Sequence, residues 1–231
     1  MRPVVELSRI SRLYAGPPEI MALHECTLTV YEGDYVTVVG PSGSGKSTLL
    51  NLIGLLDTPT SGNLRLKGED VIAYSEDQRA RARGSHIGFV FQSFQLLEQR
   101  TCVENVMLSD LYTGNTAKES RRLATAALES VGLGGRENNM PSELSGGQQQ
   151  RVAIARALAG DPSILLCDEP TGNLDSSTAE KIMGLFDRLN AAGRTILLIT
   201  HDHAAARRGN RTVAILDGAL TERMPESESA V

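Results

Sequence analysis

The stretch that decides the fold is Tyr35-Val36-Thr37-Val38-Val39-Gly40-Pro41-Ser42-Gly43-Ser44-Gly45-Lys46-Ser47-Thr48. It begins with a continuous β-branched run, which is typical of a central strand covered on both faces of a parallel sheet. The next residues fit the pattern G-x-x-x-x-G-K-[ST], and residues 48–56 have a helical pattern. Strand, glycine-rich loop and helix in this order predict an α/β fold with a phosphate-binding loop.

The chemistry of this phosphate loop (residues 40–47) follows from its residue types. Glycines let backbone N–H groups surround phosphate oxygens without steric clash, and the following helix adds the positive end of its dipole at Thr48. Lys46 supplies a positive charge for the β- and γ-phosphates, and the Ser47 hydroxyl is a ligand for Mg²⁺. The alternative is a glycine-rich turn with an incidental lysine.

Further strands and helices extend this pattern along the chain. Residues 164–167 and 195–199 are continuous apolar runs that also suit central strands. Between them Ile182, Leu185, Phe186 and Leu189 form one helical stripe, and Gly193 is a plausible stop. Strand, helix and strand in sequence predict βαβ units and a parallel sheet.

The remaining segments predict the accessory parts of one domain over residues 1–220. Residues 1–33 and 62–72 alternate as in short strands of an antiparallel flank, and residues 93–160 are mainly helical. The end of the chain, residues 221–231, reads as a polar tail.

Composition limits the function. The net charge of −5 and the pI of about 5.5 do not suggest a nucleic-acid binder, so we expect no nucleic-acid partner. The three cysteines, Cys26, Cys102 and Cys167, are scattered, which fits a reducing compartment. Neither a signal peptide nor a membrane span is evident, so we expect a soluble protein that acts on membranes only through a partner.

Two carboxylates follow the apolar run at 164–167. Asp168 and Glu169 are expected at the carboxyl edge of the sheet, where open α/β sheets bind ligands. Together with the phosphate loop they suggest that Asp168 holds Mg²⁺ and that Glu169 is the general base for an attacking water. Without the phosphate loop, the same pattern would indicate only a strand entering a surface turn.

A third motif carries a family resemblance. The signature loop (residues 144–148) reads Leu144-Ser145-Gly146-Gly147-Gln148 and continues as Gln149-Gln150-Arg151-Val152-Ala153-Ile154-Ala155-Arg156-Ala157-Leu158. This resembles the signature sequence of ABC ATPases, in which the loop contacts the γ-phosphate bound to the opposite subunit. Its small residues open a helix whose N-terminus can face an anion. By itself the loop could also be a capped helix start.

The resemblance assigns roles to residues elsewhere. Gln92 looks like the glutamine that senses Mg²⁺ and the attacking water, and His201 looks like the switch histidine that hydrogen-bonds the γ-phosphate. Tyr14 is similar to the aromatic residue that stacks on adenine, with a core aromatic as the alternative. The interface loop (residues 173–175), Asn173-Leu174-Asp175, resembles the segment that crosses the dimer interface.

The family further implies a RecA-like P-loop NTPase core with the ABC ATPase fold, and an ATPase that works with ATP and Mg²⁺. Two copies arranged head to tail would clasp two ATP molecules in a closed homodimer, which opens on hydrolysis.

The family also implies a membrane partner, an integral membrane permease on a separate chain. Residues 93–112, which include Phe94, Leu97, Val103 and Tyr112, would form the groove for a short permease helix; their alternative role is the core of the helical subdomain. The protein would then be cytoplasmic and peripheral on the cytoplasmic face of a bacterial cell membrane.

The subgroup is indicated by residues 91–97, 104–106 and 171–175, which resemble the branch of macrolide exporters, lipoprotein-releasing systems and antimicrobial-peptide exporters. Residues 98–100 lack the proline often found there. An ABC ATPase that regulates cell division or cell-wall hydrolysis through a membrane partner is the alternative function. A DNA-associated ABC ATPase would carry a coiled-coil insertion or a second cassette, and this chain has neither.

Overall fold

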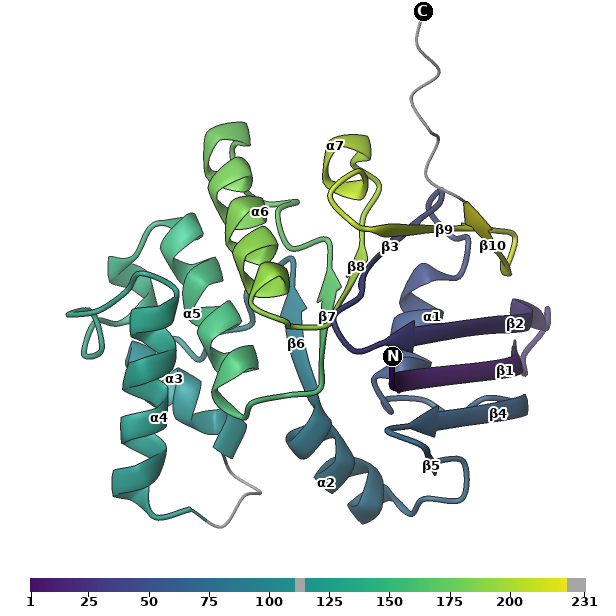
Figure 1. Ribbon diagram of the computed structural model, residues 1–231, viewed down its shortest axis with the longest axis horizontal. Helices are drawn as coiled ribbons and strands as arrows, with labels where there is room; N and C mark the ends of the chain where they lie inside the picture. Colours follow the sequence, from purple (N-terminus) through teal and green to yellow (C-terminus); the bar gives the residue numbers. More distant parts are fainter. Residues whose placement is uncertain (111–114, 224–231) are drawn as a thin grey trace, which may run out of the picture. The chain divides into compact units, whose positions relative to one another are not determined.

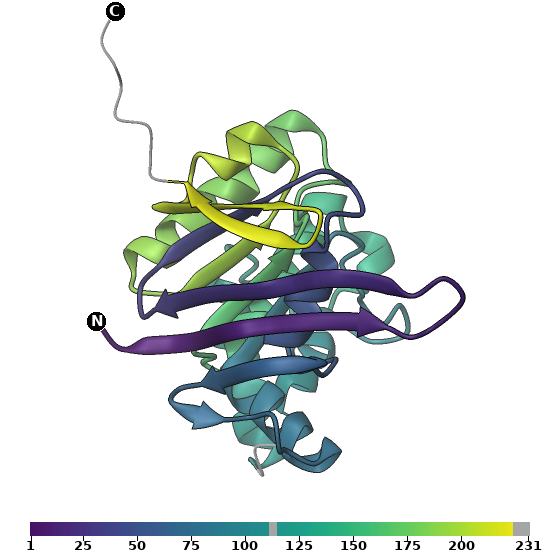
Figure 2. The ribbon, with the colours of Figure 1, turned by 90° about the vertical axis from the view of Figure 1, so that its right-hand side faces the viewer.

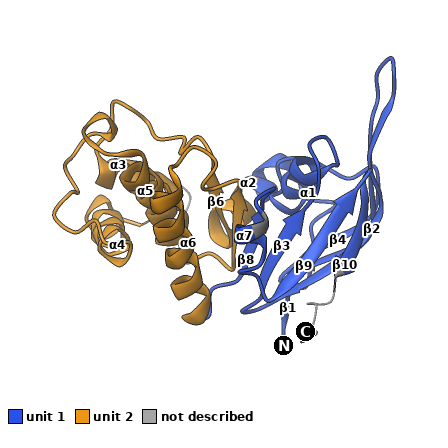
Figure 3. Cartoon of the chain, turned by 90° about the horizontal axis from the view of Figure 1, so that it is seen from above, with its two compact units in different colours: residues 1–79, 193–231 blue, residues 80–192 orange. Residues whose placement is uncertain are grey.

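The computed structural model (Figure 1) describes residues 1–110 and 115–223. The chain divides into two units, residues 1–79 with 193–231 and residues 80–192, which are blue and orange in Figure 3. Each unit contains strands paired in parallel together with helices. The predicted α/β class is therefore confirmed.

The elements of the first unit are, in chain order, β1 (Pro3–Tyr14), β2 (Ile20–Tyr31), β3 (Tyr35–Val39), α1 (Lys46–Ile53), β4 (Ser61–Leu66), β5 (Glu69–Asp70), β8 (Ile196–Ile199), α7 (His203–Ala206), β9 (Arg211–Leu216) and β10 (Ala219–Arg223). Helix α2 (Glu76–His86) crosses into the second unit, which continues with β6 (Ile87–Phe91), α3 (Cys102–Met107), the 3₁₀ turn η1 (Leu108–Asp110), α4 (Ala117–Ser130), the 3₁₀ turn η2 (Pro141–Glu143), α5 (Gly146–Ala159), β7 (Ile164–Asp168) and α6 (Ser176–Ala191).

An antiparallel sheet forms the predicted flank of the first unit. Its strand order is β2-β1-β4-β5, and Figure 2 shows β1 lying between β2 and β4. On β2 the side chains of Cys26, Leu28 and Val30 are buried while Thr27 is exposed. This alternation follows from the two-residue repeat of a strand that has one face on the core.

The parallel strands of the first unit are β3, β8 and β9, with β3 between the other two. Val36, Val38 and every residue of β8 are at most 1% exposed, as expected for strands covered on both faces. Strand β10 pairs antiparallel with β9 and includes residues 221–223, the first part of the expected polar tail. The rest of that tail, 224–231, lies outside the described residues.

The second unit pairs β6 and β7 in parallel and contains the predicted helical segment. Its helix α6 buries Ile182, Leu185 and Phe186, the predicted stripe. Helix α6 ends at Ala191, shortly before Gly193, whose φ of 92° no other residue type adopts easily.

The helices α3, α4 and α5 pack on one another within residues 93–160. Of the residues proposed for the permease groove, Val103 and Val106 are fully buried, whereas Leu97 is 46% exposed. Leu111 and Tyr112 lie outside the described residues. Within residues 1–110 and 115–223, none of the helices combines the length and apolar character that crossing a membrane requires.

Candidate functional site

The glycines of the phosphate loop are required by the path of the chain between β3 and α1. A Cβ atom on Gly40 would lie 2.2 Å from the carbonyl oxygen of Ile215. Gly45 is the N-cap residue of α1, has a φ of 105°, and would bring a Cβ to 2.5 Å from the carbonyl oxygen of Ala22. Both contacts are with backbone atoms, so a larger residue would displace the loop.

Helix α1 begins without a cap. Gly45 offers no side chain, and among the described residues no group accepts a hydrogen bond from the N–H of Lys46, Ser47 or Thr48. The hydroxyl of Ser44 is buried and also has no partner in the described part of the chain. Open N–H donors at the positive end of a helix dipole fit a phosphate group.

Lys46 adds a positive charge to these donors. Its ammonium group donates hydrogen bonds to the carbonyl oxygens of Gly40 (2.9 Å) and Pro41 (2.7 Å). The ammonium group therefore lies against the start of the same loop, while Ser42 and Gly43 are exposed to solvent. The loop thus combines a cation with open backbone donors, the arrangement that an anionic ligand needs.

His201 lies at the same sheet edge as the phosphate loop. Strands β3 and β8 pair in parallel, with Val38 opposite Ile199. Gly40 lies two residues after Val38, and His201 lies two residues after Ile199, so both leave the sheet at the same edge. The N–H of Thr200 donates to the carbonyl oxygen of Val38 (3.2 Å), which holds the two chain segments together here. His201 itself is exposed, as a residue that contacts a ligand must be.

Tyr14, at the end of β1, is half-buried rather than a core aromatic. Its hydroxyl donates to Asp57 Oδ2 (2.9 Å), and the guanidinium carbon of Arg12 lies 4.4 Å from its ring centroid. The ring is therefore held by neighbours in its own unit.

In the second unit, Asp168 and Glu169 lie where β7 ends. Asp168 pairs with Phe91 across the β6–β7 ladder, and both carboxylates are half-buried. Glu169 has a φ of 48°, a left-handed conformation that costs a residue with a Cβ about 1–2 kcal/mol. Such strain gathers at functional sites, where the surrounding structure enforces it.

Cys167 precedes these carboxylates but is not a nucleophile. Its side chain is fully buried, and burial raises the pKa of its thiol well above the usual range, with the charge of Asp168 adding to the effect. The thiol stays protonated and acts as a small apolar group.

Gln92 is bound to the interface loop. Its amide nitrogen donates to Asn173 Oδ1 (3.0 Å), and the amide nitrogen of Asn173 donates to the carbonyl oxygen of Gln92 (3.1 Å). A Cβ on Gly172 would lie 2.7 Å from the Gln92 amide nitrogen, so only glycine leaves room for this pair. The carbonyl oxygen of Glu169 accepts from Gly172 N–H (3.0 Å), which ties the same turn to the end of β7.

Gln150 is a residue that the sequence did not single out. It is fully buried on α5, and its amide nitrogen donates to the carbonyl oxygens of Pro170 (2.5 Å) and Phe91 (3.3 Å). It thereby joins the ends of β6 and β7 just where Gln92 and Glu169 follow. The signal available in the sequence was a polar residue within an otherwise apolar stripe of this helix.

The signature loop forms a capped start of α5. The hydroxyl of Ser145 accepts from the N–H of Gln148 (3.4 Å), and the Gln148 side chain accepts from the N–H of Ser145 (3.0 Å), a reciprocal capping box. A Cβ on Gly147 would lie 2.4 Å from a methyl group of Thr178 on α6. On Gly146 it would lie 3.3 Å from Leu174, so the signature loop and the interface loop are neighbours.

Asp175 ends the interface loop and caps α6. Its carboxylate accepts from the backbone N–H of Thr178 (3.0 Å). Hydrogen bonds from the hydroxyl and N–H of Thr178 lower the pKa of this carboxyl.

The predicted residues thus fall in both units. The first holds Tyr14, the phosphate loop with Thr48, and His201; the second holds Gln92, the signature loop, Asp168, Glu169 and the interface loop. Within the described residues, no three His, Cys, Asp or Glu side chains gather as a metal site of their own. Ser47 in the first unit and Asp168 in the second each offer a hard oxygen ligand, the type that Mg²⁺ prefers.

The chain is similar to known proteins in both sequence and structure. A family model described as ABC transporter matches residues 23–172. YknY, an uncharacterized ABC transporter ATP-binding protein of Bacillus subtilis (strain 168), is 49% identical over 218 residues, which cover 94% of this chain and 95% of that protein. The macrolide export ATP-binding/permease protein MacB of Syntrophobacter fumaroxidans is 49% identical over 228 residues, 97% of this chain but 32% of that protein.

Among solved structures, the chain is similar to the ATP-binding cassette MJ0796, determined as a dimer in a post-hydrolysis state bound to ADP and Pi. The TM-score is 0.86 at 42% sequence identity, and the match covers 96% of this chain and 99% of that chain.

Proposed function

The chain belongs to the ABC transporter family as an ATP-binding and ATP-hydrolysing subunit, and on that premise we propose which residues perform each task. The observation that carries the assignment is the uncapped start of α1. There the backbone N–H groups have no acceptor among the described residues, and together with the Lys46 ammonium group they can bind an anion. The backbone of the phosphate loop and Thr48 bind the phosphates, and Lys46 leaves its carbonyl partners to contact the β- and γ-phosphates.

Hydrolysis is assigned to polar residues at strand ends. Ser47, Asp168 and Gln92 would hold Mg²⁺, and this ion would supply positive charge against the charge that develops on the phosphate oxygens. Glu169 accepts a proton from the attacking water, and His201 hydrogen-bonds the γ-phosphate. Gln150 keeps the ends of β6 and β7 together, so it positions Gln92 and Glu169 without touching the nucleotide.

The signature loop acts on the nucleotide of a second copy. Capping satisfies the N–H of Gln148, but in the described part of the chain nothing accepts from the N–H groups of Gly146 and Gly147. A γ-phosphate on the partner would complete them, and the neighbouring interface loop would lie at the same contact. The dimer of MJ0796, determined with ADP and Pi, supports a homodimer, and we propose that this chain forms it when ATP is bound.

A groove in the second unit is the proposed seat for a short helix of the permease. Its volume is about 290 Å³, and its lining includes Phe89, Phe91, Gln95, Leu108 and Arg156. Phe91, Gln95 and Leu108 lie in or next to the segment 93–112, and the groove is mainly apolar, as a helix-in-groove contact requires.

The loop beside this groove is held rigidly. Asn105 is fully buried, accepts from the N–H of Leu97 (2.7 Å), and donates to the carbonyl oxygens of Leu97 (3.1 Å) and Arg100 (2.9 Å). Asn105 therefore holds the backbone that carries the exposed Leu97 side chain.

The partner is proposed to be an integral membrane permease on a separate chain. The MacB relative carries ATP-binding and permease functions, whereas YknY is matched over almost its whole length as an ATP-binding protein. We place this subunit on the cytoplasmic face of the membrane and assign the system to the exporter or force-transmitting class.

Glu169→Gln tests the assignment of base and dimer together. The variant keeps the shape of Glu169 but cannot accept the proton, so turnover falls about a thousandfold while ATP still binds. Light scattering after size-exclusion chromatography with Mg·ATP is expected to show a stable dimer. Glu129→Gln, on the exposed face of α4, is the control. A Glu169→Gln protein that binds ATP yet stays monomeric contradicts the dimer, and one that keeps full turnover contradicts the base.

Leu97→Arg tests the permease contact that we propose for residues 93–112. It is expected to abolish co-sedimentation with membranes that contain the permease while leaving basal ATPase activity unchanged, because Leu97 lies outside the nucleotide residues. Leu216→Arg, at a still more exposed leucine on β9 (61% against 46% for Leu97), is the control. Equal membrane binding by the two variants would place the partner elsewhere.

A further inference from the structure

Three side chains form a closed cluster where β1 ends. Arg12 and Tyr14 are two residues apart on the strand and so share one face. The guanidinium of Arg12 stacks on the ring of Tyr14, with 4.4 Å between its carbon and the ring centroid. Asp57 joins both: its Oδ1 lies 2.8 Å from Arg12 Nη2, and its Oδ2 accepts from the Tyr14 hydroxyl at 2.9 Å.

The cluster fixes the orientation of the tyrosine ring. The hydroxyl is anchored at one point by Asp57, and the ring plane is set by the guanidinium that covers one face. Arg12 Nε is buried without a hydrogen-bond partner among the described residues, so stacking and the ion pair, rather than complete hydrogen bonding, determine where the guanidinium lies.

The cluster is also tied to the far end of α1. The N–H groups of Leu56 (2.8 Å) and Asp57 (3.2 Å) donate to the carbonyl oxygen of Asn51 in the last turns of that helix. Thr60 N–H donates to the carbonyl oxygen of Ser11 on β1 (2.8 Å). The segment 57–60 is therefore bonded on one side to the helix that starts at the phosphate loop and on the other side to the strand that carries Tyr14.

We propose that Arg12 and Asp57 are positioning residues for the nucleotide base. They hold the Tyr14 ring so that the face opposite Arg12 receives the purine at a set distance from the phosphate loop. The inference rests on the proposed role of Tyr14 as the stacking residue. The cation behind the ring draws electron density away from it, which strengthens stacking with an electron-rich base on the opposite face.

The test compares a ligand that has a base with one that lacks it. Binding of ADP and of inorganic pyrophosphate is measured by calorimetry for Arg12→Ala, Arg12→Lys, Asp57→Asn and Tyr14→Ala. We expect ADP affinity to fall about thirtyfold for Tyr14→Ala and about fivefold for Arg12→Ala and Asp57→Asn, with pyrophosphate unchanged. Arg12→Lys retains the charge without the planar stack and is expected to restore only part of the affinity.

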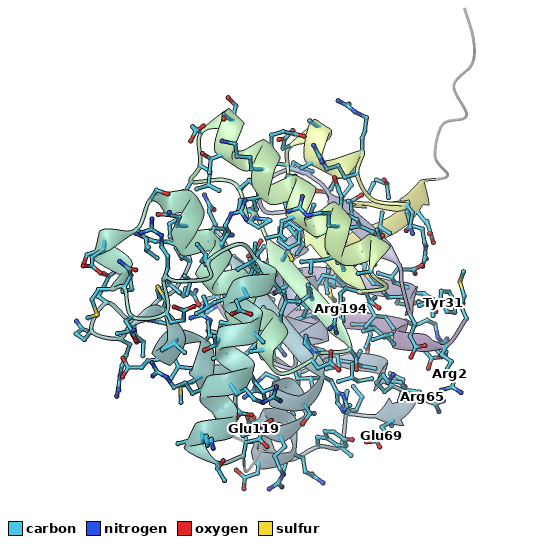
Figure 4. The ribbon with its side chains drawn as sticks, turned by 60° about the vertical axis from the view of Figure 1, so that its left-hand side comes forward. Arg2, Tyr31, Arg65, Glu69, Glu119 and Arg194 are labelled. Atoms are coloured by element: carbon cyan, nitrogen blue, oxygen red, sulfur yellow. The ribbon has the colours of Figure 1, made fainter. Side chains whose placement is uncertain are left out.

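A double variant and a kinetic measurement separate positioning from a structural role. In the Tyr14→Ala background, Arg12→Ala is expected to cost nothing further, because it acts through the ring. The KM for ATP rises about fivefold in Arg12→Ala while kcat stays the same. Arg65→Ala, at an exposed arginine of the same sheet that Figure 4 labels, leaves both ligands unaffected.

Three results overturn the proposal. Equal losses for ADP and pyrophosphate would mean that Arg12 supports the phosphate loop or the fold. A full fivefold loss in the Tyr14→Ala background would mean that Arg12 contacts the base itself. Unchanged ADP affinity in Tyr14→Ala would remove the stacking platform, yet it would leave ATP binding by the phosphate loop intact.

Discussion

Helices α1 and α5 both begin at runs of small residues, and their first turns are built differently. Gly45 precedes α1 with no side chain to cap it, and the N–H groups of its first turn have no acceptor in the described part of the chain. Ser145 precedes α5 and forms a capping box with Gln148, which satisfies donors of its first turn from within. The sequence suggested similar anion sites, but the structure makes one open and the other partly closed.

This difference separates a site that can bind nucleotide within one subunit from a site that we expect to complete the nucleotide site of a second subunit. An uncapped helix start with a lysine can hold phosphate without help from another subunit. A helix start that is already capped loses little without a ligand, and within residues 1–110 and 115–223 the N–H groups of Gly146 and Gly147 have no acceptor. We therefore expect α1 to determine whether nucleotide binds, and α5 to determine what a second subunit does with it.

The largest effect is expected at the open helix start. Lys46→Ala removes the cation that the phosphate loop adds to its backbone donors, so kcat/KM for ATP is expected to fall about a thousandfold, and ADP binding with it. Steady-state ATPase assays and calorimetry measure both. Lys118→Ala, at an exposed lysine of α4, is the control. Retained ADP affinity in Lys46→Ala would mean that the backbone donors suffice and would weaken the contrast with α5.

Alanine at the two glycine positions sharpens the comparison on stability. Gly45→Ala combines a left-handed φ with a 2.5 Å contact to a backbone oxygen, and is expected to lower the free energy of unfolding by about 2–4 kcal/mol. Gly147→Ala meets a side-chain methyl of Thr178 at 2.4 Å rather than backbone, but moving that methyl also turns the Thr178 hydroxyl away from Asp175, so we expect a smaller loss of about 1–2 kcal/mol. Urea denaturation monitored by circular dichroism compares them. Equal losses would show that the two loops are under the same packing constraint.

The capped helix start is tested by Ser145→Ala. Loss of the cap is expected to cost about 1 kcal/mol in the free energy of unfolding. ADP affinity of the single subunit stays unchanged, whereas ATP turnover, which needs the second copy, falls about tenfold. A parallel loss of ADP affinity would place the signature loop at the nucleotide of its own chain and contradict the division of roles.

The smallest effect distinguishes a neutral cap from a charged one. Asp175 caps α6 with a carboxylate whose pKa is lowered by Thr178, so its contribution to stability is complete above the usual Asp range near 3.9 and is lost as pH falls through the lowered value. The difference in melting temperature between the native protein and Asp175→Asn should therefore shrink between pH 7 and pH 3. The difference for Ser145→Ala should stay constant, because a hydroxyl does not titrate over that range.

Much of the fold could be predicted because its signals are local. Continuous apolar runs predicted the buried strands, and the spacing of Ile182, Leu185 and Phe186 predicted α6. Boundaries were less certain: residues 48–56 were expected as a helix, whereas α1 covers Lys46–Ile53. It ends there because Gly54 closes the last turn and Leu55 adopts a φ of 54°. Helix α2 went unnoticed because it buries none of its residues and so has no apolar stripe.

The candidate site divides in the same way. The phosphate loop is one contiguous stretch of sequence, and the carboxylates at 168 and 169 are a second one. The chemistry of each could therefore be predicted from the sequence. The contacts of Asp57 with Tyr14 and of Gln150 with Phe91 join residues 43 and 59 positions apart, and no periodic pattern reports such pairs. The capping box at Ser145 could be predicted from Ser followed by Gln three residues later. Only the structure shows that both of its hydrogen bonds form.

The left-handed backbone at Glu169 also bears on the directed evolution of this protein. A glycine there would relax a conformation that costs a glutamate about 1–2 kcal/mol, so heat selection of random variants without an activity screen would enrich for Glu169→Gly. The enriched proteins would melt at a higher temperature and, without the proposed base, would no longer turn over ATP. With Glu169 as the base that we propose, stability and catalysis make opposite demands on this position, so a selection for thermal stability should leave residue 169 unchanged.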